Sequence, residues 1–216
     1  MIHNLSEHDS IVSSILSEIR DQDSHGDRFK FRLNLERIGE LIAYEISKTL
    51  EFESVDIKTP LASTTGRKLK EQPVLATVLR AGLPFHTGFL RIFEKADNGF
   101  VYAFRKHHQD DTFDILEGYI TCPNIDQRTV ILADPMLASG ASLISAIEQM
   151  KQFGKPKRLI FAALIAAEPG IKKVIEKFPD LEIWTAAIDP ELDSKSYIVP
   201  GLGDAGDLAF GEKSQR

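Results

Sequence analysis

Short apolar runs alternate with amphipathic stretches along most of this 216-residue chain. The apolar runs contain many β-branched residues, which favours buried strands over helices. Strands are predicted at 73–79, 100–104, 130–133, 159–166 and 181–187. Helices are predicted between them, at 84–93, 143–153 and 170–178. Strands that alternate with helices predict an α/β fold with a mostly parallel central sheet flanked by helices.

The remaining segments complete a single predicted domain over residues 1–216. Residues 1–27 are polar except for an amphipathic piece at 11–16, which we expect to pack on the main body or on a partner subunit. Apolar residues at helical spacing predict a helix over 34–50, with Asn34 as its N-cap. Residues 55–68 are expected to form an extended arm or hairpin, which suggests a homodimer or a higher homo-oligomer.

Composition excludes several classes of partner. A net charge of −6 argues against non-specific nucleic-acid binding and against an anionic membrane surface. No apolar run approaches the roughly 18 residues of a membrane span, and the N-terminus lacks the pattern of a signal peptide. The one cysteine, Cys122, excludes an internal disulfide and suits a reducing cytosol, so we expect a cytoplasmic protein. Its simplest interpretation is a half-buried small residue.

An acidic residue and a loop of small residues follow the strand predicted at 130–133, directly before an amphipathic helix. The carboxyl ends of parallel strands are where ligands bind, and the N–H groups at a helix N-terminus favour a phosphate. Asp134 would repel a bare phosphate but accept hydrogen bonds from sugar hydroxyls, so the pattern indicates phosphate beside ribose. The alternative interpretation is a tight strand-to-helix turn whose small residues serve close packing and bind no ligand. We call this segment the phosphate loop; its residues are Asp134, Pro135, Met136, Leu137, Ala138, Ser139, Gly140, Ala141 and Ser142.

The form Asp-Pro-Met-Leu-Ala-Ser-Gly-Ala-Ser resembles the 5-phosphoribosyl-1-pyrophosphate (PRPP) motif of type I phosphoribosyltransferases, and the uracil phosphoribosyltransferases in particular. Residues 79–83, the region of Arg105 and residues 197–207 agree with that family, and the resemblance runs from about 28 to 211. It implies a phosphoribosyltransferase fold with a C-terminal base-binding hood at 190–211. The implied reaction converts uracil and PRPP to UMP and pyrophosphate in pyrimidine salvage, with Mg²⁺ carried on the PRPP phosphates.

The resemblance also implies roles for individual residues. Arg105 and Asp204 would be catalytic, with Arg105 stabilising the leaving group and Asp204 acting through a metal-bound water rather than as a direct metal ligand. The implied PRPP-binding residues are Arg80, Arg105, Asp204 and the whole phosphate loop. The implied uracil-binding residues are Ile198, Gly203, Asp204 and Ala205.

Three local expectations accompany these assignments. The alternative for Arg80 is a surface arginine paired with a nearby carboxylate. Because relatives often have a non-proline cis peptide at the pyrophosphate loop, we expect one adjoining Arg80 or Ala81. Ala141 stands where relatives usually have glycine, and its Cβ would tolerate a positive φ poorly, so we expect weaker PRPP binding.

Two further motifs have alternative interpretations. Residues 201–206 match G-x-G-x-x-G, but only ten residues follow Gly206, too few for the strand that a dinucleotide site requires, so we reject that interpretation. His107 and His108 could suggest a metal site. Because adjacent side chains point in different directions, we favour a mobile polar lid over residues 106–114 that excludes water.

Three rival functions are considered. One is an RNA-binding attenuation regulator on the same fold, which the acidic charge disfavours. The others are a phosphoribosyltransferase for another base and an inactive homologue, the latter suggested by Ala141 and by Leu208-Ala209, where relatives often have a basic residue and an isoleucine. GTP binding with allosteric control is a further property that the resemblance implies.

Overall fold

A mostly parallel sheet forms the centre of the computed structural model, which describes residues 1–102, 104–107, 113–116 and 119–212 and gives the backbone alone for 104–107 and 113–116. The strand order is β1-β12-β11-β9-β4-β5-β8, and β10 pairs with β11 beside this path. All pairs are parallel except β5 with β8. The bounds are β1 Ile2–Asn4, β4 Val74–Leu79, β5 Asp97–Tyr102, β8 Ile120–Thr121, β9 Thr129–Ala133, β10 Met136–Leu137, β11 Arg158–Ala167 and β12 Glu182–Asp189.

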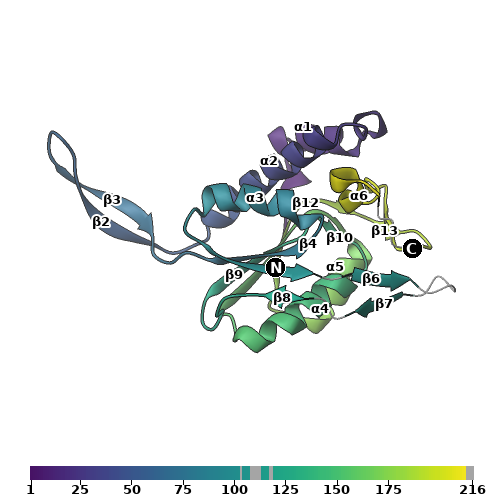
Figure 1. The fold of residues 1–216 in the computed structure, drawn as a ribbon. Coiled ribbons are helices and arrows are strands. Elements are labelled where there is room, and N and C mark those ends of the chain that lie inside the picture. Colours follow the sequence, from purple (N-terminus) through teal and green to yellow (C-terminus); the bar gives the residue numbers. More distant parts are fainter. Residues whose placement is uncertain (103, 108–112, 117–118, 213–216) are drawn as a thin grey trace.

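Helices cover both faces of this sheet (Figure 1). One face packs against α1 (Ile11–Arg20), α2 (Arg28–Ser47) and α3 (Gly82–Ile92), and the other against α4 (Ala141–Met150) and α5 (Glu168–Lys177). Alternate residues of β9 serve the two cores, since Ile131 belongs to the first and Val130 and Leu132 to the second. The 3₁₀ turns are η1 (Leu5–Glu7), η2 (Gln22–Ser24) and η3 (Lys151–Phe153). The predicted α/β fold is therefore confirmed.

The N-terminal region differs in part from the prediction. The helix predicted from Asn34 begins at Arg28, because the side chain of Asp27 accepts a hydrogen bond from the Lys30 N–H at 2.9 Å and caps it there. Asn34 is a buried residue inside α2, not an N-cap, and its amide donates to Glu18. The amphipathic piece forms α1 and packs on the main body as expected. Strand β1, which pairs with β12 at the sheet edge, was not predicted.

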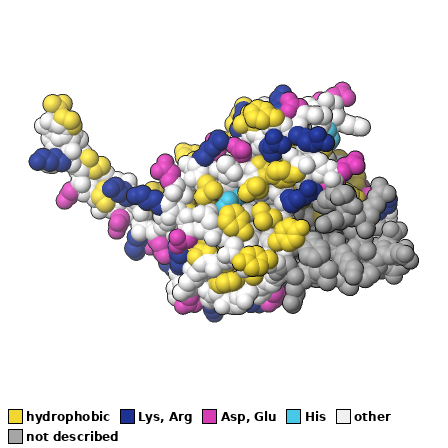
Figure 2. Space-filling view, in the orientation of Figure 1, with side chains coloured by type: hydrophobic (Ala, Val, Ile, Leu, Met, Phe, Trp, Pro, Cys, Tyr) yellow, Lys and Arg dark blue, Asp and Glu magenta, His cyan; other side chains and the backbone are white. Residues whose placement is uncertain are grey.

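The predicted arm is confirmed as an antiparallel hairpin of β2 (Phe52–Lys58) and β3 (Ser63–Leu69). Figures 1 and 2 show it projecting from the body of the molecule. Its tip residue Leu61 is 97 % exposed. Among the described helices, none is long and apolar enough to cross a membrane.

The strand predicted at 100–104 is divided into two in the structure. Strand β5 ends at Tyr102, which pairs with Leu79 at the end of β4. The chain then enters a separate hairpin of β6 (Phe104–His107) and β7 (Phe113–Leu116). Arg105 therefore lies within β6 and not at the end of a main-sheet strand, because pairing with β4 sets where β5 stops.

Candidate active site

The phosphate loop begins at the carboxyl edge of the sheet and is held there by β11. The Asp134 N–H donates to the Ala162 carbonyl at 3.0 Å, and the Pro135 carbonyl accepts from Leu164 and Ile165, both at 3.0 Å. The loop then forms β10, a short strand that the sequence did not predict, parallel to β11. These bonds fix the loop backbone at the edge where a parallel sheet binds its ligands.

The loop ends at the N-terminus of α4, which has no side-chain cap among the described residues. Gly140 is the N-cap with φ 76°, a left-handed conformation that favours glycine. Ser139 Oγ is buried and has no hydrogen-bond partner in the described part of the chain. The first N–H groups of α4 and this hydroxyl are therefore donors suited to an anion.

Ala141 is the first residue of α4 and is not among the residues with positive φ. The positive φ falls on Gly140, one residue earlier. The backbone argument for weaker binding at Ala141 was therefore wrong, because a helical residue accommodates a Cβ without strain.

Helix α5 supports the phosphate loop from behind. A Cβ on Gly170 would lie 1.9 Å from the carbonyl oxygen of Ala138, and one on Gly140 would lie 2.6 Å from the Val174 side chain. Such close approach is possible only without a side chain at these positions. Helix α5 thus limits how far the loop can move away from the edge of the sheet.

A second loop, at the end of β4, carries Arg80. Buried Thr77 connects it to the neighbouring strand, because its hydroxyl donates to the Ala133 carbonyl at 2.8 Å. The Leu79–Arg80 peptide bond is cis, which confirms the expectation of a non-proline cis peptide there. The Arg80 guanidinium donates to Asp207 at 3.1 Å and to the Gly211 carbonyl at 3.4 Å. The pairing with a carboxylate is therefore present, and it joins this loop to the hood.

The hood consists of a two-stranded ribbon, β13 (Glu191–Leu192) with β14 (Ile198–Val199), followed by α6 (Ala205–Phe210). Asp204 caps α6 by accepting from the Asp207 N–H at 3.0 Å. The side chains of Ile198 and Ala205 are buried in the core. Gly203, with φ 89°, is exposed, and a Cβ there would meet no described atom within 4 Å. The segment can therefore present its main chain, rather than side chains, to a ligand.

A cavity of about 270 Å³ lies between the hood and the N-terminal segment. Its volume is near the lower end of the roughly 300–1,000 Å³ of small-molecule sites. The lining residues are His25, Arg28, Leu202, Gly203, Asp204, Asp207, Leu208 and Glu212. His25 and Arg28 were not predicted as site residues, although the resembling segment begins at Arg28. Both residues are more than 170 positions in the sequence from the hood residues that line the cavity, so only the folded structure brings them together.

Several predicted features fall outside the described residues or are tested only in part. The side chain of Arg105 is outside the described part, and so are His108 and the greater part of the predicted lid. No group of three or more potential metal ligands occurs among the residues that are described. Helix α6 begins within the G-x-G-x-x-G match, at Ala205.

Comparison with known sequences gives a consistent result. The family model described as uracil phosphoribosyltransferase matches residues 6–212. A uracil phosphoribosyltransferase of Porphyromonas gingivalis is 45 % identical over 214 residues, which cover 99 % of both chains. One from Pyrococcus furiosus is 46 % identical and covers 93 % of this chain and 86 % of its own.

Solved structures agree on the fold. A protein of Aquifex aeolicus superimposes with a TM-score of 0.86 at 30 % identity, covering 99 % of this chain and all of its own. The orotate phosphoribosyltransferase of Mycobacterium tuberculosis in complex with PRPP gives a TM-score of 0.53 at 13 % identity. It covers 86 % of this chain and 95 % of its own, a likeness of fold alone.

Proposed function

Because the chain belongs to the uracil phosphoribosyltransferase family, we propose that it converts uracil and PRPP to UMP and pyrophosphate in pyrimidine salvage. In this pentosyl transfer, N1 of uracil forms a bond to the anomeric carbon of PRPP. The bond from that carbon to the pyrophosphate oxygen breaks, and the N1 proton is lost. The developing charge is that of an oxocarbenium-like sugar and a departing pyrophosphate, so the protein contributes by positioning, charge stabilisation and exclusion of water.

The observation that carries this proposal is the uncapped N-terminus of α4 beside Ser139 Oγ, a buried hydroxyl without a partner in the described chain. A buried polar group without a hydrogen bond costs about 1–3 kcal/mol, and a phosphate oxygen would satisfy it. The 5-phosphate of PRPP would accept from this hydroxyl and from the first N–H groups of α4. Asp134 lies at the other end of the same loop, where its carboxylate would accept from the ribose hydroxyls.

The two arginines supply local positive charge for the diphosphate. Arg80 is paired with Asp207, and both side chains are about one-third exposed. An exposed pair of this kind contributes about 0–1 kcal/mol, so a diphosphate can replace Asp207 at little cost. A guanidinium can hold two of its oxygens at once. Arg105 would act from β6 on the same group and stabilise its charge as it leaves.

Uracil would be recognised by the main chain of Ile198, Gly203 and Ala205. One edge of the base presents an acceptor, a donor and an acceptor, which N–H, C=O and N–H groups can match. The exposed, positive-φ backbone of Gly203 and the buried side chains on either side favour this kind of recognition. Asp204 lies within the segment and would face the ribose and pyrophosphate.

Mg²⁺ fits this donor set as a companion of PRPP. The ion usually binds one or two carboxylates together with substrate phosphates and several waters. Asp204 is the carboxylate that would hold it through a bound water, and bound Mg²⁺ would neutralise charge on the pyrophosphate. One Asp204 oxygen already accepts from the helix N-terminus of α6, which keeps the carboxylate oriented.

The chain is also proposed to act as one domain that assembles with a second copy. The projecting hairpin is one reason, since its tip is exposed. A second is the exposure of large apolar side chains, among them Leu83 and Ile92 of α3; Figure 2 shows apolar side chains gathered on one face of the molecule. Cytoplasmic location, GTP control and a lid over 106–114 stay predictions.

Formation of UMP from labelled uracil and PRPP tests the function directly, with cytosine as the control base. Cytosine has a donor where uracil has an acceptor, so two N–H groups would face each other. That mismatch costs about 1–3 kcal/mol, and we expect kcat/KM to fall about ten- to a hundredfold. Comparable turnover of both bases would refute main-chain recognition of uracil. No turnover of any base would favour the inactive homologue or the RNA-binding regulator.

A further inference from the structure

Arg20 and Asp189 form a partly buried ion pair outside the residues assigned to the reaction. Arg20 is the last residue of α1, and Asp189 is the last residue of β12. Both guanidinium nitrogens donate to the carboxylate, Nη1 to Oδ2 at 2.9 Å and Nη2 to Oδ1 at 2.6 Å. The Asp189 carboxylate is buried, with a side chain only 5 % exposed, whereas the Arg20 side chain is 23 % exposed, so the charge-assisted contact is partly shielded from solvent.

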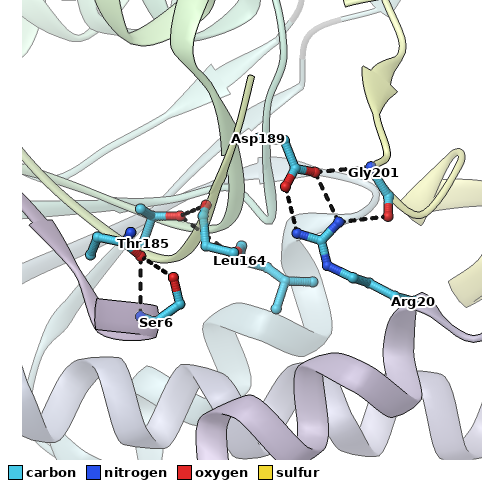
Figure 3. A network of polar contacts seen from close by, with 8 residues as sticks. Ser6, Arg20, Leu164, Thr185, Asp189 and Gly201 are labelled. Carbon is cyan, nitrogen blue, oxygen red and sulfur yellow. Dashed lines mark hydrogen bonds and ion pairs between the residues drawn. The ribbon is translucent and has the colours of Figure 1, made fainter. Parts of the chain in front are cut away.

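The same pair holds both main-chain polar groups of Gly201. The Gly201 N–H donates to Asp189 Oδ2 at 2.9 Å, and its carbonyl accepts from Arg20 Nη1 at 3.0 Å. Figure 3 shows the guanidinium and the carboxylate meeting at this one residue. Gly201 has φ 57°, and a Cβ on it would lie 2.1 Å from the Ile198 carbonyl oxygen. The chain therefore turns back on itself at the point where the two charged side chains hold it.

Gly201 lies between two of the proposed uracil-binding residues, Ile198 and Gly203. Glycine loses more conformational freedom than any other residue when it is ordered, and the segment 198–203 contains two glycines, Gly201 and Gly203. A main-chain recognition edge works only when its N–H and C=O groups are held in place before the base arrives. The ion pair supplies that restraint at the centre of the segment.

We propose that Arg20 and Asp189 are positioning residues that fix Gly201 and thereby set the uracil specificity of the hood, an inference that rests on the proposed function. Neither side chain needs to touch the substrate. The inference gives α1 a role beyond packing, because its C-terminal residue determines the geometry of a segment 181 residues further along the chain.

A second bidentate pair provides a matched control. Arg158 begins β11 and Glu182 begins β12, and their contacts are 2.5 Å and 2.6 Å long. Because these are the first residues of parallel strands, the pair lies at the edge of the sheet opposite to the candidate site. Arg158 also donates to Thr49, so it too joins separate parts of the fold. A purely structural role for Arg20 would make the two pairs equivalent in every assay.

The experiment compares Arg20→Lys, Asp189→Asn and Arg158→Lys in the full-length chain, measuring stability in urea and kcat and KM for each substrate. Lysine keeps the charge of Arg20 but cannot hold the carboxylate and the Gly201 carbonyl together. Asparagine keeps an acceptor for the Gly201 N–H but loses the ion pair.

We expect both site variants to raise the uracil KM about tenfold or more and to discriminate less against cytosine. The PRPP KM should stay within about twofold, and Arg158→Lys should keep wild-type kinetics at a similar loss of stability.

Equal changes in the uracil and PRPP KM values, or wild-type uracil KM in both site variants, would overturn the inference. If a site variant is too unstable to assay, Arg20→Gln, which removes the positive charge and with it the bidentate ion pair to Asp189, replaces it and carries the same expectation. The proposed function fails separately, through absence of UMP formation by the wild-type chain.

Discussion

The contact between Gly170 and the phosphate loop allows PRPP binding to be weakened without altering any ligand-binding group. In Gly170→Ala, the new Cβ would lie 1.9 Å from the Ala138 carbonyl oxygen and 3.3 Å from that of Leu137. Ordinary contacts begin at 3.4 Å, so α5 or the loop must shift by about 1.5 Å. Both opposing atoms are backbone, so no side-chain rotation can relieve the overlap.

The loss of PRPP affinity in Gly170→Ala depends on which part of the structure moves to relieve the overlap. Overpacking of a well-ordered interior costs about 1–3 kcal/mol, which bounds the expected loss of stability. Misplacement of a substrate-positioning group by about 1 Å can cost about a hundredfold. Because β11 holds the start of the loop, we expect the displacement to fall on residues 138–140 and to weaken PRPP binding about ten- to a hundredfold, while the uracil KM at saturating PRPP changes little.

Gly39→Ala is the matched control for that experiment. Its Cβ would lie 2.3 Å from the Phe85 carbonyl oxygen, a similar overlap between α2 and α3. We expect a similar fall in the urea midpoint but wild-type PRPP affinity by calorimetry. The reasoning is refuted if Gly170→Ala binds PRPP as the wild type does, or if Gly39→Ala weakens PRPP binding equally.

Four further outcomes are expected. Asp134→Asn keeps an oxygen for the Met136 N–H and hence the fold, but weakens PRPP binding; unchanged affinity in calorimetry removes Asp134 from the site. Ala205→Val, at a buried position, should raise the uracil KM and leave the PRPP KM unchanged; a parallel rise of both contradicts this. Burial lowers the pKa of His86, against a smaller opposing effect of its hydrogen bond to Asn98. As the pH falls below about 6.5, the unfolded chain therefore binds a proton at His86 before the folded chain does, so the free energy of unfolding decreases. Between pH 7 and 5 the urea midpoint should therefore fall less in His86→Gln than in the wild type. Burial raises the pKa of Cys122 to about 11, so its alkylation at pH 8 should be much slower in the folded chain than in urea; equal rates would contradict the burial effect.

Local patterns determined much of this protein. Alternation of apolar runs with amphipathic stretches predicted the main strands and helices, because burial on both sheet faces requires continuous apolar strands. The Asp-Pro-Met-Leu-Ala-Ser-Gly-Ala-Ser segment predicted the phosphate loop, since a strand end, small residues and a following helix are neighbours in sequence. The predicted hairpin arm was confirmed for the same reason: β2 and β3 are joined by a short turn.

Boundaries and long-range contacts needed the tertiary structure. Helix α2 begins six residues before the predicted Asn34, where the side chain of Asp27 caps it. Strand β5 stops where its partner β4 stops, which no local pattern encodes. His25 and Arg28 reach the cavity, and Arg20 reaches Gly201, across more than 170 residues of chain. The sequence thus determined which segments carry the chemistry. Only the packing of α1 and α2 against β12 and the hood decided which side chains hold those segments in place. Such contacts depend on distances in space and not on spacing along the chain.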